Sequence, residues 1–317
     1  MIEDISTRIS LSFVVPTILP DAGRIQVLLD SLCGFESEHL EVVLVNQSGI
    51  RLGLQLREPL GVQLVERLTD ARIPAANARN YGASVASGEY LFFMDDDASL
   101  FSGQDALAKL CSDGFWGSDV WVPHLGQVVN GSYISHWPAG VKKLTRRNFP
   151  RVIHEWNLII RRNIFSGLGG FPSNIGAGSP NAAQSGEAFV LGAKIVGAGL
   201  AVKLCPDIRV AHPSLYKSKP SIVVLGYSYG AGYATGLGIK SFDLWVKAYW
   251  IVRAISAPLF DIYLRPESEF IPSLDAVDKR RLRLALGRCR MVGFWDALAE
   301  RPPRSLDWLN EQSMQLV

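Results

Sequence analysis

Short apolar runs alternate with segments of helical periodicity through the first two-thirds of the chain. The runs are continuously apolar, as expected for strands buried on both faces, and the intervening segments place apolar residues on one helical face. The predicted strands cover residues 9–15, 40–45, 62–65 and 90–94, and the predicted helices cover 24–33 and 75–87. This alternation is typical of an α/β protein with a mostly parallel sheet flanked by helices. In such sheets, ligands bind beyond the carboxyl ends of the strands.

The pattern changes after about residue 115. Strands are predicted at 119–125 and 155–161, followed by two short strands at 201–204 and 208–211 that flank a turn at Cys205-Pro206-Asp207. A loop rich in Gly, Ser, Pro and Asn covers 172–185, and a helix is predicted from Gly186 to about Val196. We therefore predict a first domain at residues 1–215.

The last hundred residues have a different character. Residues 221–239 carry no charge but contain five glycines, whereas 279–290 carry six basic residues and no acidic one. A membrane-spanning helix is disfavoured because the glycines dilute the apolar stretch. We predict that residues 216–317 form a mainly helical C-terminal extension packed on the first domain, with a face that contacts a membrane surface. The ordinary alternative for the basic run is a solvated helix face.

Composition and charge exclude several classes of protein. The chain has 317 residues, of which 48% are hydrophobic and 20% charged, so it is neither disordered, collagen-like nor a coiled coil. A net charge of +2 gives no support for a nucleic-acid partner. The four cysteines are far apart and lack metal-binding spacing, and acidic residues precede the first apolar run. These features indicate a cytoplasmic protein.

Three adjacent carboxylates, Asp95, Asp96 and Asp97, directly follow the predicted strand at 90–94. Their mutual repulsion must be offset, and a divalent cation does this well. Carboxylate oxygens suit Mg²⁺ or Mn²⁺, which are completed by diphosphate oxygens and water. The alternative is a solvated acidic turn that caps a helix. The buried strand and the alternating pattern before the triplet favour the cation site.

Upstream of the triplet, Arg79 and Asn80 lie on the predicted helix at 75–87. Arginine can grip a diphosphate or stack on a base, and asparagine offers donors and acceptors to a ribose or a uracil edge. Taken alone, an arginine here would be read as a surface residue. Its position shortly before the aspartates makes it part of a larger pattern.

Eight short motifs follow one another in order along the chain. They are Val14-Val15-Pro16-Thr17, Val43-Leu44-Val45-Asn46-Gln47-Ser48, Ala78-Arg79-Asn80-Tyr81-Gly82, Gly88 to Asp97, Gly169-Gly170-Phe171, Ser185-Gly186-Glu187, Pro206-Asp207 and Val210-Ala211-His212. This ordered set resembles the family 2 glycosyltransferases of the GT-A fold. The resemblance covers about residues 9–213, and the C-terminal hundred residues carry no matching motif.

The resemblance implies transfer of one sugar, with inversion, from a nucleotide-diphosphate sugar to a glycan or lipid-linked acceptor. On family frequency the nucleotide is UDP, with dTDP second. Residues 9–115 would bind the donor and 116–215 would carry the acceptor and catalytic part. The donor-site residues implied are Pro16, Thr17, Asn46, Gln47, Ser48, Arg79, Asn80, Asp95 and Asp96, and the ligands implied for Mn²⁺ or Mg²⁺ are Asp95, Asp97 and His212. The alternative for His212 is a hydrogen-bonded structural residue. Many relatives have an acidic residue where this chain has Asn46 and Gln47.

An inverting transfer needs a carboxylate that takes the proton of the acceptor hydroxyl. Relatives usually carry Gly-Glu-Asp where this chain has Gly186-Glu187-Ala188, so Glu187 is the remaining candidate base and Asp207 a weaker one. Glu187 could instead only complement the helix N-terminus. The resemblance places Trp156 and Asn157 beside the acceptor, although a core Trp is an equal alternative.

Parts of the sequence also fit functions other than sugar transfer. A strand followed by Asp95 to Leu100 also resembles haloacid dehalogenase-type phosphohydrolases, with Asp95 as nucleophile and Asp97 as acid/base, but that motif normally lies on the first strand. The absence of an acid at Ala188 leaves a non-catalytic GT-A scaffold open. No GxGxxG follows the first strand, which disfavours a dinucleotide-dependent oxidoreductase. We expect a cytoplasmic enzyme of polysaccharide biosynthesis, peripheral at the inner face of the membrane.

Overall fold

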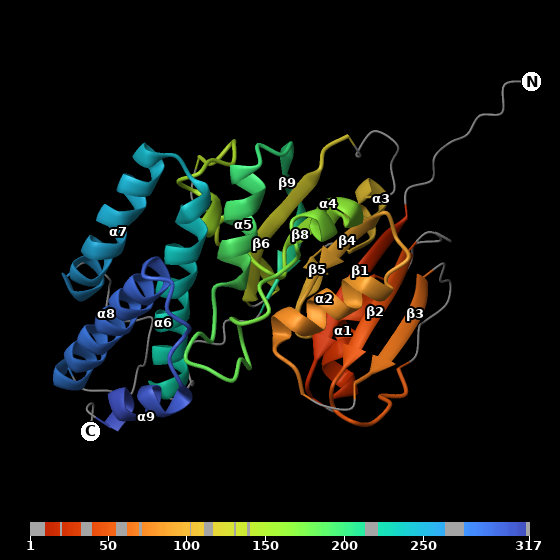
Figure 1. The fold of residues 1–317 in the computed structure, drawn as a ribbon. Helices are drawn as coiled ribbons and strands as arrows, with labels where there is room; N and C mark the ends of the chain where they lie inside the picture. Colours follow the sequence, from red (N-terminus) through yellow and green to blue (C-terminus); the bar gives the residue numbers. More distant parts are fainter. Residues whose placement is uncertain are drawn as a thin grey trace, which may run out of the picture.

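The protein is described by a computed structural model as a mixed β-sheet flanked by helices, with further helices beside one end of the sheet (Figure 1). The described residues are 10–19, 21–32, 40–54, 62–69, 72–101, 103–110, 117–129, 131–137, 140–212, 221–263 and 276–314. This architecture confirms the predicted α/β class of GT-A type with C-terminal helices.

The first four strands form the parallel part of the sheet, in the order β3-β2-β1-β4. Its strands are β1 (Leu11–Thr17), β2 (Leu40–Asn46), β3 (Val62–Leu68) and β4 (Tyr90–Phe93), and its helices are α1 (Ala22–Ser31) and α2 (Ala75–Val85). Residues of β1 alternate between two cores, because successive side chains point to opposite faces of a strand. Val14 packs with α2, whereas Phe13 and Val15 pack with α1.

The second half adds strands that are mostly antiparallel to their neighbours. They are β5 (Ser99–Phe101), β6 (Val120–Val129), β7 (Ser132–Ser135), β8 (Leu158–Arg161) and β9 (Val202–Ala211). Strand β8 joins the two halves by pairing antiparallel with both β4 and β6, and β9 pairs parallel with β6. The short elements around them are α3 (Gly103–Leu110), a 3₁₀ turn at Phe149–Arg151 and α4 (Arg162–Gly167).

Strand β9 corrects one prediction. Two strands were expected around a turn at 205–207, but the chain stays extended along β6 from Val202 to Ala211. The pairing jumps from Pro123 opposite Cys205 to His124 opposite Arg209, so the residues in between form a bulge. Pro206 lies in this bulge, where its missing N–H costs no ladder hydrogen bond.

The C-terminal helices lie at the end of the molecule opposite β3, and the first of them packs against α5 (Glu187–Gly197) (Figure 1). They are α6 (Ser221–Gly238), a 3₁₀ turn at Ile239–Ser241, α7 (Leu244–Tyr263), α8 (Ala276–Leu298) and α9 (Leu306–Met314). The glycines of α6 allow close helix packing: a Cβ on Gly232 would lie 1.9 Å from the carbonyl oxygen of Arg290 in α8. None of the described helices combines the length and apolarity needed to cross a membrane.

A third hydrophobic core connects these helices to the residues around α5. Ile175 and Val190 pack there with Leu225 and Tyr229 of α6. The boundary at residue 215 remains a prediction, because it falls at positions outside the described residues. Of the cysteines, Cys205 and Cys289 are buried free thiols, and the other two lie outside the described residues.

Candidate active site

The aspartate triplet lies where β4 ends, beside the end of β1. Strand β9 runs into the same place and delivers His212, whose Nε2 lies 3.0 Å from Asp97 Oδ1 and 3.4 Å from Asp95 Oδ2. The Trp156 ring stacks on the His212 imidazole, with 4.9 Å between the ring centroids. Residues far apart in the sequence thus meet at the strand ends, where ligands of such sheets bind.

These three side chains fit a divalent cation. One ligand atom each from Asp95, Asp97 and His212 can be chosen so that all lie within 4.8 Å of one another. Two carboxylates and an imidazole suit Mn²⁺. Burial alone would lower the pKa of His212, but its hydrogen bonds to Asp95 and Asp97 raise it to about 10. A bound cation must displace this proton, because a metal-bound imidazole is neutral.

Asp96 is held apart from the other two carboxylates. Its Oδ2 accepts a hydrogen bond of 2.7 Å from Thr17 Oγ1 at the end of β1, and its Oδ1 lies 3.6 Å from Arg24 Nη2. The same Arg24 nitrogen lies 2.6 Å from Asp97 Oδ2. Burial raises the pKa of Asp96. Sequence reasoning missed Arg24, since nothing distinguishes a lone arginine in the first helix from a surface residue.

Arg79 connects the aspartates to Glu187. The guanidinium is only 3% exposed, donates to Asp95 and places Nη1 3.5 Å from Glu187 Oε1. Burial by itself would raise the pKa of Asp95, but Arg79 and then His212 hold it well below its usual range. The guanidinium predicted to contact the donor is therefore engaged by two protein carboxylates.

Glu187 is the first residue of α5 and follows Gly186, whose φ of 104° is left-handed and suits glycine. Its side chain is buried against the backbone of Gly176. Burial, followed by the charge of Glu155, raises the pKa of Glu187 to about 7 although Arg79 opposes the shift. A carboxylate that gains its proton near neutral pH is suited to acid–base chemistry.

The loop that follows β2 is held by hydrogen bonds from its own side chains. Asn46 Nδ2 donates to the carbonyl oxygen of Ile50 at 2.7 Å, and its Oδ1 accepts from the N–H of Ser48 at 2.9 Å. Gln47 Oε1 accepts from the N–H of Ile73 at 2.7 Å. Both amides thus shape the loop whose residues were expected to contact the donor.

Two further predicted site residues also bind backbone atoms. Asn80 Nδ2 donates to the carbonyl of Phe171 at 2.8 Å, and its Oδ1 accepts from the Phe171 N–H at 3.0 Å. Asn157 is fully buried and donates to the carbonyls of Pro123 and Val152, both at 2.9 Å. Asn157 therefore holds the turn before β8, and the acceptor contact expected of it stays a prediction. Trp156 beside it stacks on His212 at the site.

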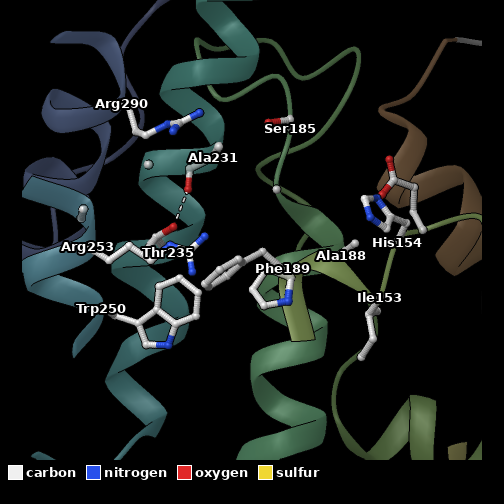
Figure 2. A pocket seen from close by; sticks show the side chains of 15 residues that line it. Ile153, His154, Ser185, Ala188, Phe189, Ala231, Thr235, Trp250, Arg253 and Arg290 are labelled. Atoms are coloured by element: carbon white, nitrogen blue, oxygen red, sulfur yellow. Dashed lines mark hydrogen bonds between the residues drawn. The ribbon is translucent and has the colours of Figure 1, made fainter. Parts of the chain in front are cut away.

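A cavity of about 340 Å³ opens next to Glu187. His154 and Ala188 line one side of it, and Arg253 and Arg290 line the side formed by α7 and α8 (Figure 2). Glu155 and Gly186 also belong to the lining. Sequence reasoning missed Glu155 and both arginines. Glu155 adjoins Trp156, which was the one available signal, while the arginines belong to a region without a recognisable motif.

Comparisons with known proteins agree with this architecture. No family model and no curated protein matches the sequence. Among solved structures, the chain is similar to S. aureus TarS residues 1–349 in complex with UDP-GlcNAc, with a TM-score of 0.57 at 18% identity over 92% of this chain and 91% of that one. It is also similar to the mannosyltransferase PcManGT from Pyrobaculum calidifontis in complex with GDP-Man and Mn²⁺, with a TM-score of 0.52 at 17% identity over 92% and 88%. The chain has the GT-A glycosyltransferase fold, as its motifs implied.

Proposed function

We propose that this protein is a glycosyltransferase that moves a sugar from a nucleotide-diphosphate sugar, UDP by preference and dTDP second, to a glycan or lipid-linked acceptor with inversion. The observation that carries the proposal is the convergence of Asp95, Asp97 and His212 at the strand ends of a GT-A fold. Similar structures hold UDP-GlcNAc, or GDP-Man with Mn²⁺, which supports a nucleotide-sugar donor and a metal.

In this proposal Asp95, Asp97 and His212 hold Mn²⁺ or Mg²⁺. The bound cation would neutralise charge that develops on the leaving diphosphate. Pro16 and Thr17 end β1 beside the triplet and would border the nucleotide, with Asp96 and Ser48 as further donor contacts. Asn46, Gln47 and Asn80 would act by shaping the surrounding loops.

The chemistry is a single displacement. The acceptor hydroxyl oxygen attacks the anomeric carbon, the bond from that carbon to the diphosphate oxygen breaks, and its electron pair leaves with the diphosphate. The hydroxyl proton passes to a carboxylate. Glu187, whose pKa is raised to about 7, is the candidate base. Glu155 is a second candidate because it lines the cavity that adjoins Glu187.

A phosphohydrolase fits the structure less well. Its nucleophile would be Asp95, but this carboxylate is engaged by Arg79 and His212. The triplet also follows β4, whereas the phosphohydrolase motif belongs on the first strand.

Asp207, the weaker candidate base, is exposed and pairs with Lys109 at 2.5 Å.

Thermal unfolding with a panel of nucleotides tests the proposal. UDP with Mn²⁺ is expected to stabilise the protein by about 2.7 kcal/mol at 100 times its Kd, and EDTA should abolish the shift. GDP and ADP serve as controls for nucleotide specificity, and dTDP should give the second-largest shift. A protein that unfolds at the same temperature with every nucleotide would contradict the donor site and favour a scaffold without turnover.

We also propose that this cytoplasmic enzyme acts in polysaccharide biosynthesis at the inner face of the membrane. Three apolar residues of α7 are strongly exposed: Leu244 is 77%, Trp245 82% and Val252 65% exposed. Such a surface suits an interfacial contact, and each nearby basic residue adds about 1 kcal/mol of attraction to anionic lipid.

Vesicle sedimentation tests the membrane contact. Wild type is expected to sediment with vesicles containing anionic phospholipid, and the double variant Leu244→Ser/Trp245→Ser should bind at least about 10-fold more weakly, since burial of these two side chains is worth several kcal/mol. Val27→Ser on α1 is the matched control, because Val27 is also exposed, at 60%. Equal sedimentation of the double variant and wild type would refute the contact.

A further inference from the structure

The cavity beside Glu187 has walls of opposite electrostatic character. Glu155 and His154 come from the turn before β8, and Arg253 and Arg290 come from α7 and α8. Figure 2 shows both arginine side chains extending from their helices toward α6. Helix α6 has no charged residue along its length, so it offers no carboxylate to Arg253. The cavity is thus lined by two guanidinium groups and by the carboxylate of Glu155.

Arg253 is placed by neutral groups. Its Nη1 donates to the Tyr249 hydroxyl at 3.2 Å, and its guanidinium lies 5.2 Å from the centre of the Trp250 ring. No carboxylate of the described part of the chain pairs with it, whereas the nearby Arg146 pairs with Asp243 at 2.6 Å. A guanidinium held in this way keeps its charge and its donors for an anion.

The remaining lining suits a compact organic group. Phe189 and Trp250 form an apolar wall, with their rings edge to face at 5.4 Å. A volume of about 340 Å³ lies in the range of small-molecule sites. Because Glu155 would repel an anion, a negatively charged ligand must place its charge at the arginine end and its neutral part toward Glu155.

We propose that this cavity binds the acceptor and that the acceptor carries a phosphate group, which Arg253 and Arg290 hold. Arginine matches phosphate with paired N–H donors. With the phosphate at the arginine end, the acceptor hydroxyl points toward Glu155 and the first residues of α5, which include the candidate base Glu187. The inference rests on the proposed glycosyl transfer and names the acceptor chemistry that this chain recognises.

Calorimetric titration tests the phosphate site in the full-length protein, with UDP and excess Mn²⁺ filling the donor site. The probes are farnesyl diphosphate, for a lipid-linked phosphate, and glycerol 3-phosphate, for a phosphate-linked polyol. We expect at least one probe to bind, and Arg253→Gln and Arg290→Gln each to weaken that binding at least 10-fold without changing the affinity for UDP. Arg253→Lys and Arg290→Lys, which keep the charge, should recover part of it. Arg281→Gln, an exposed arginine of the same helix as Arg290, is the control and should bind like wild type.

The outcomes distinguish a lipid-linked acceptor from a phosphate-bearing polymer, and failure of the phosphate site from failure of the proposed function. Binding of farnesyl diphosphate alone supports a lipid-linked acceptor, and binding of glycerol 3-phosphate supports a phosphate-bearing polymer. Probe binding that UDP displaces and Asp97→Asn abolishes belongs to the donor site and overturns the proposal. So does equal binding by wild type, Arg253→Gln and Arg290→Gln, or binding of neither probe. If UDP fails to bind while the arginine-dependent probe still does, the proposed function fails and the phosphate site stands.

Discussion

Asp97→Asn is expected to lower sugar transfer at least about 100-fold, which corresponds to about 2.7 kcal/mol of lost transition-state stabilisation. Asp97 contributes to the candidate metal site and lies 3.0 Å from His212 and 2.6 Å from Arg24. An amide removes the negative charge that draws a cation between Asp97, Asp95 and His212, and it also weakens the link to α1. The loss should therefore be one of metal affinity together with turnover.

The release of UDP from a UDP-sugar, followed at increasing Mn²⁺ concentration, measures this effect. Asp207→Asn is the matched control, because Asp207 is an exposed carboxylate paired with Lys109 outside the site, and it should behave like wild type. Should Asp97→Asn show the same Mn²⁺ dependence and rate as wild type, the metal site would have to be placed elsewhere.

Transfer at saturating metal is expected to fall about tenfold for each pH unit below about pH 7 and to level off above it. Burial and the charge of Glu155 raise the pKa of Glu187 to about 7, so below this pH the carboxyl group is protonated and cannot take the acceptor proton. Above it, Glu187 is ionised and the reaction no longer gains from further alkalinity. A positioned base contributes about 10²–10⁴ in rate, so Glu187→Gln should lose at least 100-fold at pH 8.

The pH profile of the variants decides which carboxylate is the base. If Glu187 is the base, Glu187→Gln is slow at every pH and lacks the acidic limb, while Glu155→Gln keeps a limb shifted to lower pH because Glu155 no longer raises the pKa of Glu187. The reverse result, in which Glu155→Gln loses the rate, would move the role to Glu155. Glu89→Gln, at an exposed ion pair with Arg161, controls for a general effect of the substitution.

The pattern of apolar residues was sufficient to predict the parallel part of the sheet and the place of the acidic triplet. A continuous apolar run can form either an internal strand or a buried helix. These runs are short and are separated by segments of helical periodicity, and both features favour strands. The position of Asp95 to Asp97 directly after such a run places them at a strand end without any knowledge of the contacts. The motif resemblance added His212 and the GT-A fold, and the structure brings His212 to Asp95 and Asp97.

Which polar groups meet could not be predicted in this way. Arg24 reaches Asp97, Arg79 turns to Glu187, and Asn157 donates to the carbonyl of Pro123. The cavity likewise combines distant parts of the chain, because its lining includes Arg253 of α7, Arg290 of α8 and residues at the start of α5. Periodicity records which face of an element is apolar, but it holds no information on the register and packing angle that bring two distant side chains within hydrogen-bonding reach. Those quantities arise from the packing of the whole chain, so the partners of each charge became visible only in three dimensions.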